Sequence, residues 1–317
     1  MTLSSDVRAP HQSRPTKWEG PLNTQRPPRG KEGWLALRYL TPGMTGFVLF
    51  IVVPLVASMA ISLFDWPLFG SPEFVGLENY RAMVTTDPVF WRVLGNTAFF
   101  TVAYTALNLV LAVALAVWLQ HLGSWAPFFR VLFFVPVVVP MVANALMWRL
   151  MLDDTGVVNS ALSVIGIDGP SWLGDPKLAM ASLIAMSIWA GIGYNVVVLS
   201  AGLNNINRSV LEAAKIDGAN GWKLFGRVVF PLLSPSIFFC TIMTVIGAFK
   251  VFTQPFMLTN GGPGDATNTL VLYLYRQGFS FNDLGYASAL AWVLFVFVML
   301  ITALQFVGQK RWVTYEH

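Results

Sequence analysis

The stretch SVLEAAKIDGANGWKLFGRVVFP, residues 209–231, is a polar and charged segment between two long apolar runs. The run before it covers Leu178–Leu203 and the run after it covers Pro231–Phe249. Each run approaches or exceeds the roughly 20 apolar residues that cross a bilayer. A membrane protein with such a segment between two spans presents a folded element at one surface, which predicts a docking site for a soluble partner.

Composition places the whole chain in the same class. Of its 317 residues, 55% are hydrophobic and 11% are charged, against about 45–50% and 25% in soluble proteins. Six stretches without Asp, Glu, Lys or Arg are long enough to cross a bilayer. They are Met44–Phe64, Thr97–Leu119, Val131–Trp148, Leu178–Leu203, Pro231–Phe249 and Tyr286–Val307. We predict an all-α, polytopic membrane protein with six transmembrane helices, surrounded by membrane lipid.

The distribution of basic residues predicts the orientation. Fourteen Lys and Arg residues fall in the N-terminal tail, the second and fourth connections and the C-terminal end. Five fall in the opposite connections, and Lys250 lies at the outer end of the fifth span. Because short cytoplasmic segments carry the excess of Lys and Arg, both termini are predicted to be cytoplasmic. The net charge of +4 follows from this asymmetry and does not indicate a nucleic-acid partner.

Three regions follow from this topology. Residues 1–41 are predicted to be a cytoplasmic tail, disordered because it is rich in Pro, Ser, Arg and Gln. Within it, Trp34–Leu40 forms either a short helix along the inner interface or an ordered run-in to the first span. Residues 42–308 form the six-helix domain, with a cytoplasmic connection at 204–230. Residues 309–317 form a second cytoplasmic tail.

Several features that drive transport are missing from the sequence. The span interiors hold no Asp, Glu, Lys, Arg or His, whereas ion-coupled carriers place such residues inside the membrane. The Gly30-Lys31 pair is followed by Glu32 and so does not form an ATP-binding phosphate loop. The three histidines lie in tails or in a loop, so no metal site is predicted. We therefore predict a non-enzymatic subunit with no catalytic residue and no cofactor, which takes its energy from other proteins.

The local chemistry of residues 209–231 predicts two short helices. Ser209 and Glu212 have the spacing of a capping box, which begins a helix over Val210–Asp217. Gly218 then ends this helix in the left-handed conformation, and Asn220 caps a second helix that leads towards the fifth span. Glu212 is either a capping residue of a solvated hairpin or a contact to the soluble partner.

The same stretch fits a longer pattern that begins with E-A-A, any three residues and Gly. Nine further residues then separate this Gly from an aliphatic residue, which is followed by any residue, an apolar residue and Pro. The matching positions are Glu212, Ala213, Ala214, Gly218, Val228, Phe230 and Pro231. This EAA motif resembles the cytoplasmic coupling loop in the membrane subunits of ATP-binding-cassette importers. The resemblance implies that the following residues contact an ATPase subunit: Glu212, Ala213, Ala214, Asp217, Gly218 and Ala219.

The resemblance extends from about Phe74 to Val307. Leu77–Tyr80 with Asp87–Trp91, and Leu258–Gly264, resemble outer segments of importer permeases for sugars. The branch implied is carbohydrate uptake, and the expected fold is the type I importer permease with a coupling-helix loop. The resemblance also implies a bacterial or archaeal plasma membrane and transport of a sugar or oligosaccharide. Glycerol-3-phosphate or a glycerophosphodiester is the alternative substrate.

Members of this family work together with other subunits. The resemblance implies a second permease in a heterodimer, two ATPase subunits that bind ATP and Mg, and an external substrate-binding protein. A membrane-embedded transferase with Asp217-Gly218 at the inner surface is the rival hypothesis. Against it, the phosphotransferase pattern D-x2-D-G-x2-A-R has Ala214 in place of its first Asp.

Candidates for the substrate pathway are polar and aromatic residues at pore depth, because hydroxyl-rich ligands need hydrogen bonds and aromatic faces. They are Asn144, Trp148, Trp189, Tyr194, Asn195, Lys250 and Gln254. Each of them is alternatively a helix–helix hydrogen bond or an interfacial residue. Pro136 and Pro140 predict a break in the third span, either beside a cavity or for packing. Asn260–Gly264 is predicted to be a tight outer loop with left-handed turns, with a phosphate cradle as the alternative.

Overall fold

The computed structural model of this chain describes residues 29–67 and 70–314. It consists of two units, Met1–Val56 and Ala57–His317, which we describe in turn. The predicted disordered tail falls mostly on residues 1–28, which lie outside the described residues.

The first unit is helical over its described residues 29–56, and its last helix ends at Ile61, within the second unit. Helix α1 (Arg29–Phe47) continues through the π-helical turn η1 (Val48–Val52) into α2 (Val53–Ile61). Together they give an apolar helix over Gly33–Ile61 that is long enough to cross a membrane. Trp34–Leu40 lies inside this continuous helix.

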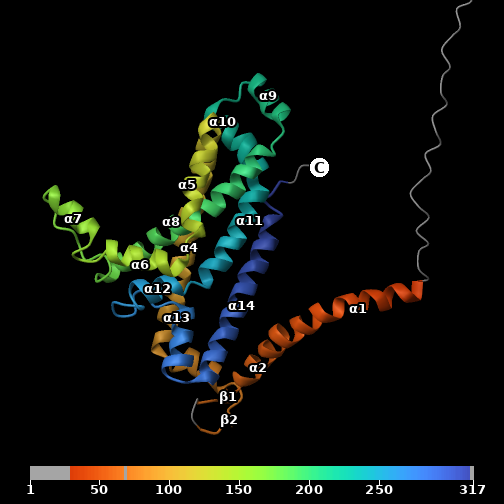
Figure 1. Cartoon of the computed structure of the whole chain (residues 1–317), viewed down its shortest axis with the longest axis vertical. Coiled ribbons are helices and arrows are strands. Elements are labelled where there is room, and N and C mark those ends of the chain that lie inside the picture. The colour runs from red at the N-terminus through yellow and green to blue at the C-terminus, as the bar shows by residue number, and fades with distance from the viewer. Residues whose placement is uncertain (1–28, 68–69, 315–317) are drawn as a thin grey trace, which may run out of the picture. The chain divides into compact units, whose positions relative to one another are not determined.

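The second unit is a bundle of long helices with short helices at both ends (Figure 1). The long helices are α4 (Pro88–Gln120), α5 (Ala126–Val138), α8 (Pro176–Asn204), α11 (Phe230–Phe249) and α14 (Leu284–Gln309). The short ones are α3 (Glu78–Thr85), α6 (Met141–Met151), α7 (Val157–Val164), α9 (Arg208–Ile216), α10 (Gly221–Leu224), α12 (Thr253–Leu258) and α13 (Leu270–Tyr275). The turns are η2 (Gly123–Trp125), η3 (Phe225–Val229) and η4 (Arg276–Ser280), and β1 (Phe64–Asp65) pairs antiparallel with β2 (Glu73–Phe74).

Small residues allow the central helices to approach closely. Helix α8 packs against α4, α5 and α11, and α14 packs against α11. Ala112 and Ala116 on α4 are fully buried in the cluster that joins α4, α8 and α11. A Cβ atom at Gly193 would lie 2.1 Å from the carbonyl oxygen of Phe133 on α5, so only glycine fits at this crossing. Close approach through small residues is typical of helix pairs in membranes.

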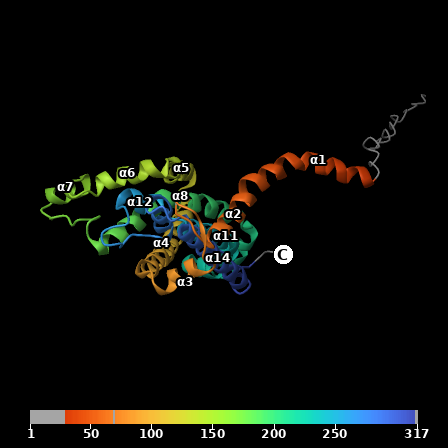
Figure 2. The ribbon, with the colours of Figure 1, turned by 90° about the horizontal axis from the view of Figure 1, so that it is seen from below.

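The third predicted span is not straight. Its two halves, α5 and α6, are bent by 95° at a break around Val139 and Pro140. Proline has no N–H to continue the helix and holds the preceding residue in an extended conformation, and Val139 has a ψ of 133°. The predicted break is therefore confirmed at Pro140, and the predicted third span Val131–Trp148 is divided between α5 and α6. Helix α7 lies at the far end of α6 in both views (Figures 1 and 2).

Five helices of the described chain are long and apolar enough to cross a membrane. The bent pair α5–α6 makes a sixth span if its two halves are taken together. Helices α9 and α10 lie at the opposite end of the second unit from β1 and β2 (Figure 1). The segment that carries the EAA motif, residues 209–231 and called the EAA segment below, is therefore at one end of the bundle, away from the β hairpin.

Candidate functional site

The first helix of the EAA segment begins earlier than predicted. Asn207 is its N-cap residue, and the Asn207 Oδ1 atom accepts hydrogen bonds from the Ser209 backbone N–H (3.0 Å) and hydroxyl (2.9 Å). The predicted capping box of Ser209 and Glu212 is therefore wrong, because Asn is as good a cap as Ser and comes first. Glu212 is exposed and makes no hydrogen bond or ion pair within the described residues.

The end of this helix is a Schellman motif centred on Gly218. The Gly218 N–H donates to the Lys215 carbonyl at 3.0 Å, and the Ala219 N–H donates to the Ala214 carbonyl at 2.9 Å. These are the two bonds of that motif, and Gly218 has a φ of +84°. The predicted left-handed helix end is confirmed.

The second helix of the segment is joined directly to the fifth span. Asn220 occupies the N-cap position of α10, but its side chain makes no capping hydrogen bond, so only its position agrees with the prediction. From Gly221 the chain runs through α10, η3 and α11 as a single helix of 29 residues that ends at Phe249. Pro231 lies in the first turn of α11 without interrupting this helix.

Two exposed apolar side chains in the EAA segment were missed by the sequence reasoning. Ile216 at the end of α9 and Trp222 on α10 are each 87% exposed. Large apolar residues beside charged ones on a folded element mark protein contact sites. The signal available in the sequence was their position within an otherwise polar connection.

A cavity of about 390 Å³ lies between the central helices. Helices α4, α8 and α11 form most of its wall, with one residue each from α6 and α12. The lining residues are Phe100, Tyr104, Met141, Ser187, Gly191, Tyr194, Asn195, Met243, Thr244, Gly247, Ala248, Val251 and Gln254. Three predicted substrate-pathway residues, Tyr194, Asn195 and Gln254, are among them.

A buried polar network connects three helices at this cavity. The Asn195 Nδ2 atom donates to Asn108 Oδ1 at 2.7 Å and to Thr244 Oγ1 at 3.0 Å. Asn195 Oδ1, Asn108 Nδ2 and the hydroxyls of Thr101 and Thr105 have no hydrogen-bond partner among the described atoms. Buried polar atoms are nearly always satisfied. Asn195 is the one residue of this group that lines the cavity, so its unpaired oxygen favours water or a hydroxylated ligand there. Asn108 was missed, although it continues a row of threonines along one face of α4.

Aromatic rings line the same cavity. Phe100 and Tyr104 are stacked, with their centroids 5.5 Å apart and their planes at 12°. Tyr104 and Tyr194, which carry a hydroxyl group as well as a ring, are both among the lining residues. Aromatic faces combined with a few hydrogen-bonding groups are typical of small-molecule pockets of about 300–1,000 Å³.

The other four predicted pathway residues lie outside the cavity lining. Asn144 Nδ2 donates to the carbonyls of Pro136 (3.0 Å) and Val139 (3.4 Å), so it stabilises the break between α5 and α6. Trp148 and Trp189 pack together with ring centroids 5.9 Å apart. Lys250 is the exposed C-cap residue of α11.

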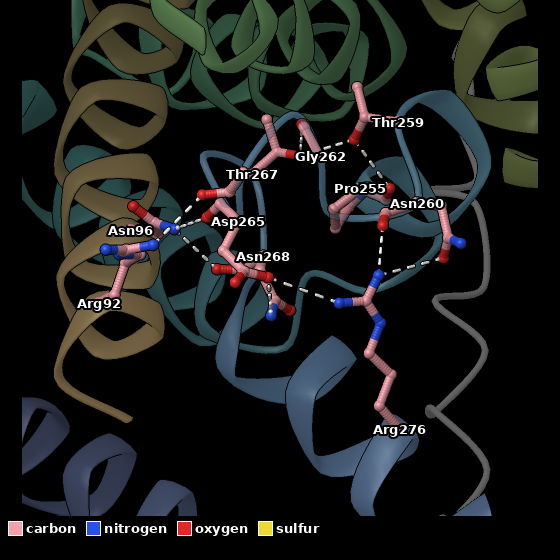
Figure 3. A network of polar contacts seen from close by, with 11 residues as sticks. Arg92, Asn96, Pro255, Thr259, Asn260, Gly262, Asp265, Thr267, Asn268 and Arg276 are labelled. Atoms are coloured by element: carbon pink, nitrogen blue, oxygen red, sulfur yellow. Dashed lines mark hydrogen bonds and ion pairs between the residues drawn. The ribbon is translucent and has the colours of Figure 1, made fainter. Parts of the chain in front are cut away.

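The loop Asn260–Asn268 is tightly folded (Figure 3). Asn260, Gly261, Gly264 and Asp265 all have positive φ, which confirms the predicted left-handed turns. Arg276 donates to the Asn260 carbonyl and lies 3.6 Å from the Asp265 carboxylate. The Arg276 guanidinium already binds groups of the loop itself, and the Asp265 carboxylate beside it would repel a phosphate. The geometry therefore disfavours the alternative that this loop cradles a phosphate.

Figure 3 also shows how the loop is attached to α4. The Asn96 Nδ2 atom donates to the carbonyls of Asp265 (2.7 Å) and Asn268 (2.9 Å), and Arg92 donates to the carbonyl of Gly264 at 3.3 Å. The loop is therefore fixed to the beginning of the helix that supplies Phe100 to the cavity.

Asp87 joins the beginning of α4 to α13 and α14. One of its carboxylate oxygens caps α4 by accepting from the backbone of Val89 (2.8 Å) and Phe90 (3.2 Å). The other accepts from the hydroxyls of Tyr273 (2.6 Å) and Tyr286. Burial, and then the neighbouring carboxylate, raise the pKa of Tyr273, so its hydroxyl stays a hydrogen-bond donor at neutral pH.

Comparison with known proteins assigns the family. Residues 108–313 match the family of binding-protein-dependent transport system inner membrane components. The chain belongs to this family and is a multi-pass membrane permease of the ATP-binding-cassette transporter type. This membership favours the transport hypothesis over the membrane-embedded transferase.

Particular relatives share most of the chain. The sulfoquinovosyl glycerol transport system permease protein SmoG of Agrobacterium fabrum is 37% identical over 274 residues, which cover 85% of this chain and 88% of that protein. The lactose transport system permease protein LacF of Rhizobium radiobacter is 34% identical over 290 residues, covering 88% and 94%. A chain in the crystal structure of a bacterial alginate ABC transporter has the same fold, with a TM-score of 0.78, 21% identity and coverage of 89% and 96%.

Proposed function

We propose that this chain is the translocation-pathway subunit of an ATP-driven importer for a sugar or oligosaccharide. Its partners are a second permease in a heterodimer, two ATPase subunits that bind ATP and Mg, and an external substrate-binding protein. The observation that carries the proposal is the continuous helix Gly221–Phe249. One end of this helix belongs to the EAA segment, and the other supplies Met243, Thr244, Gly247 and Ala248 to the cavity.

The EAA segment is the point where the ATPase subunits act. Glu212 offers an exposed carboxylate, and Ile216 and Trp222 offer apolar side chains that a partner can bury. The Schellman motif at Gly218 fixes the angle between α9 and α10. A rigid-body movement imposed on α9 is therefore passed to α11 and to the cavity wall. We propose that the segment and both chain termini lie on the cytoplasmic side, which the distribution of basic residues supports.

The cavity chemistry supports a sugar. Its described lining residues include hydroxyl, amide and aromatic groups but no Lys, Arg, Asp or Glu. Sugar hydroxyls are matched by such neutral donors and acceptors, whereas a phosphate ester is best recognised by Arg or Lys. The names of two relatives, the sulfoquinovosyl glycerol permease SmoG and the lactose permease LacF, also support a sugar as substrate. The glycerol-3-phosphate alternative is thus less well supported.

Reconstituted uptake tests this proposal. The chain is purified with the permease, ATPase and binding protein that copurify with it, and the complex is placed in liposomes. Radiolabelled neutral oligosaccharides and glycerol-3-phosphate are then offered in separate experiments, with and without ATP. We expect ATP-dependent accumulation of a sugar. Accumulation of glycerol-3-phosphate alone would move the substrate to the alternative class, and the absence of ATP-dependent uptake of either would contradict the proposed function.

A further inference from the structure

The C-terminal end of the described chain is not a free tail. After α14 ends at Gln309, the chain turns back towards α11, and the Trp312 ring packs edge-to-face on Phe238 at a centroid distance of 5.9 Å. Phe306 packs on the same Phe238 ring at 5.6 Å. Two residues further on, the Thr314 N–H donates to the Ser234 hydroxyl at 2.9 Å. The described part of the predicted tail is therefore attached to α11.

Ser234 has a second role at the same place. Pro235 has no N–H, so it cannot donate to the carbonyl of Pro231 four residues earlier, as a helix normally requires. The Ser234 hydroxyl donates to that carbonyl at 2.6 Å instead. A serine hydroxyl has one proton to donate and lone pairs to accept with, so it can satisfy Pro231 and receive the Thr314 N–H together. Ser234 is fully buried, and this favours keeping both bonds.

The position of Ser234 along α11 gives these bonds a mechanical consequence. The π-helical turn Phe225–Val229 lies just before it, towards the EAA segment. The cavity residues Met243 and Thr244 lie beyond it on the same helix. Any displacement that enters α11 from the EAA segment therefore passes Ser234 before it reaches the cavity.

We infer that Ser234 is a positioning residue that fastens the segment Lys310–Thr314 to the inner end of α11, so that α14 moves together with α11 during transport. This inference rests on the proposed coupling function. Without the attachment, α11 would bend at Pro231 and Pro235 when its beginning is displaced. ATP would then still be hydrolysed, but less of the movement would reach the cavity.

Three variants of the assembled transporter test this role. Ser234→Ala removes both hydrogen bonds, and Ser234→Thr restores the hydroxyl as the conservative rescue. Thr241→Val is the matched control, because among the described residues the Thr241 hydroxyl bonds only to the Ile237 carbonyl of its own helix (2.7 Å). A fourth protein, ending after Trp312, keeps the serine and removes the amide that it binds.

Two quantities are measured on complexes matched for assembled protein. The first is sugar accumulated per ATP hydrolysed, and the second is hydrogen exchange of the peptide that contains Thr314. For Ser234→Ala and for the chain that ends after Trp312, we expect the amount of sugar accumulated per ATP hydrolysed to fall at least threefold. For Ser234→Ala we also expect about tenfold faster exchange, with ATP hydrolysis retained. Ser234→Thr and Thr241→Val should match the wild type in both quantities.

Other results would overturn the inference. An unchanged ratio and unchanged exchange in Ser234→Ala would show that the attachment has no role. Equal losses in Ser234→Ala, Ser234→Thr and Thr241→Val would show that only helix packing matters. Hydrogen exchange detects the Ser234–Thr314 bond even if the complex transports no sugar. A failure of the proposed transport function can therefore be told apart from a failure of this inference.

Discussion

The substitution Gly218→Val separates a shaped coupling element from a generic polar connection. Gly218 has a φ of +84°, in the left-handed region where a side chain is strained. Nothing lies within 4 Å of a Cβ atom built at this position. The effect of the substitution therefore comes from the backbone and not from a clash with a neighbouring side chain.

The magnitude follows from the turn itself. An L-residue in the left-handed conformation costs about 1–2 kcal/mol, and a β-branched residue lies at or above the upper end. If the turn opens instead, the bonds from Gly218 to Lys215 and from Ala219 to Ala214 are lost, each worth about 0.5–1.5 kcal/mol. A change of one or two kcal/mol shifts the equilibrium between the closed and open turn by a factor of about 5–30.

We expect Gly218→Val to insert and assemble but to lose most ATP-driven uptake, because an opened turn no longer fixes α9 relative to α10. Gly218→Asn is the matched control, since Asn tolerates the left-handed conformation better than other residues with a side chain, and it should retain part of the activity. The assay is sugar uptake by reconstituted complexes matched for assembled protein. Near-normal and equal uptake by both variants would refute the reasoning.

Four further predictions use the same complex. Glu212→Ala should change helix stability by less than about 0.5 kcal/mol, as an exposed substitution, yet weaken copurification of the ATPase; full uptake would leave Glu212 without a coupling role. Trp222→Ala should reduce ATPase binding with no loss of thermal stability. Asn195→Ala should lower the free energy of unfolding by about 1–3 kcal/mol and raise the KM for sugar, measured by thermal unfolding and uptake. Cysteine at Ser71 should react with an impermeant reagent outside sealed cells and cysteine at Asn220 should not, and labelling of Asn220 from outside would overturn the orientation.

The features that sequence reasoning located well are those set by local chemistry. Five of the six predicted spans are crossing-length helices, since uninterrupted apolar runs leave the backbone no alternative in a membrane. The left-handed end at Gly218 and the break at Pro140 follow from residues with unusual backbone preferences. Local rules could not predict which residue caps α9, because Asn207 and Ser209 are both good N-cap residues.

The candidate cavity was harder to predict because its residues come from distant parts of the chain. Asn195 is 87 residues from Asn108 and 49 residues from Thr244 along the sequence. Sequence reasoning selected Asn195 by its residue type, but its partners depend on how α4, α8 and α11 pack. The Ser234–Thr314 bond, which spans 80 residues, was missed for the same reason. Polar residues within apolar spans are thus easy to find individually and hard to pair.

The physical demand on α11 explains why these long-range contacts gather along it. From Gly221 to Thr244 the helix covers about 35 Å at 1.5 Å per residue. A displacement at the EAA segment reaches the cavity only if the helix between them stays stiff, and this part contains a π-helical turn, Pro231 and Pro235. Prolines and π-helical turns are the usual places where helices bend. The Ser234 hydroxyl supplies the bond that Pro235 cannot make, and packing against α4, α8 and α14 supports the rest of the helix. The helix that connects the two candidate sites is therefore reinforced at its weakest point.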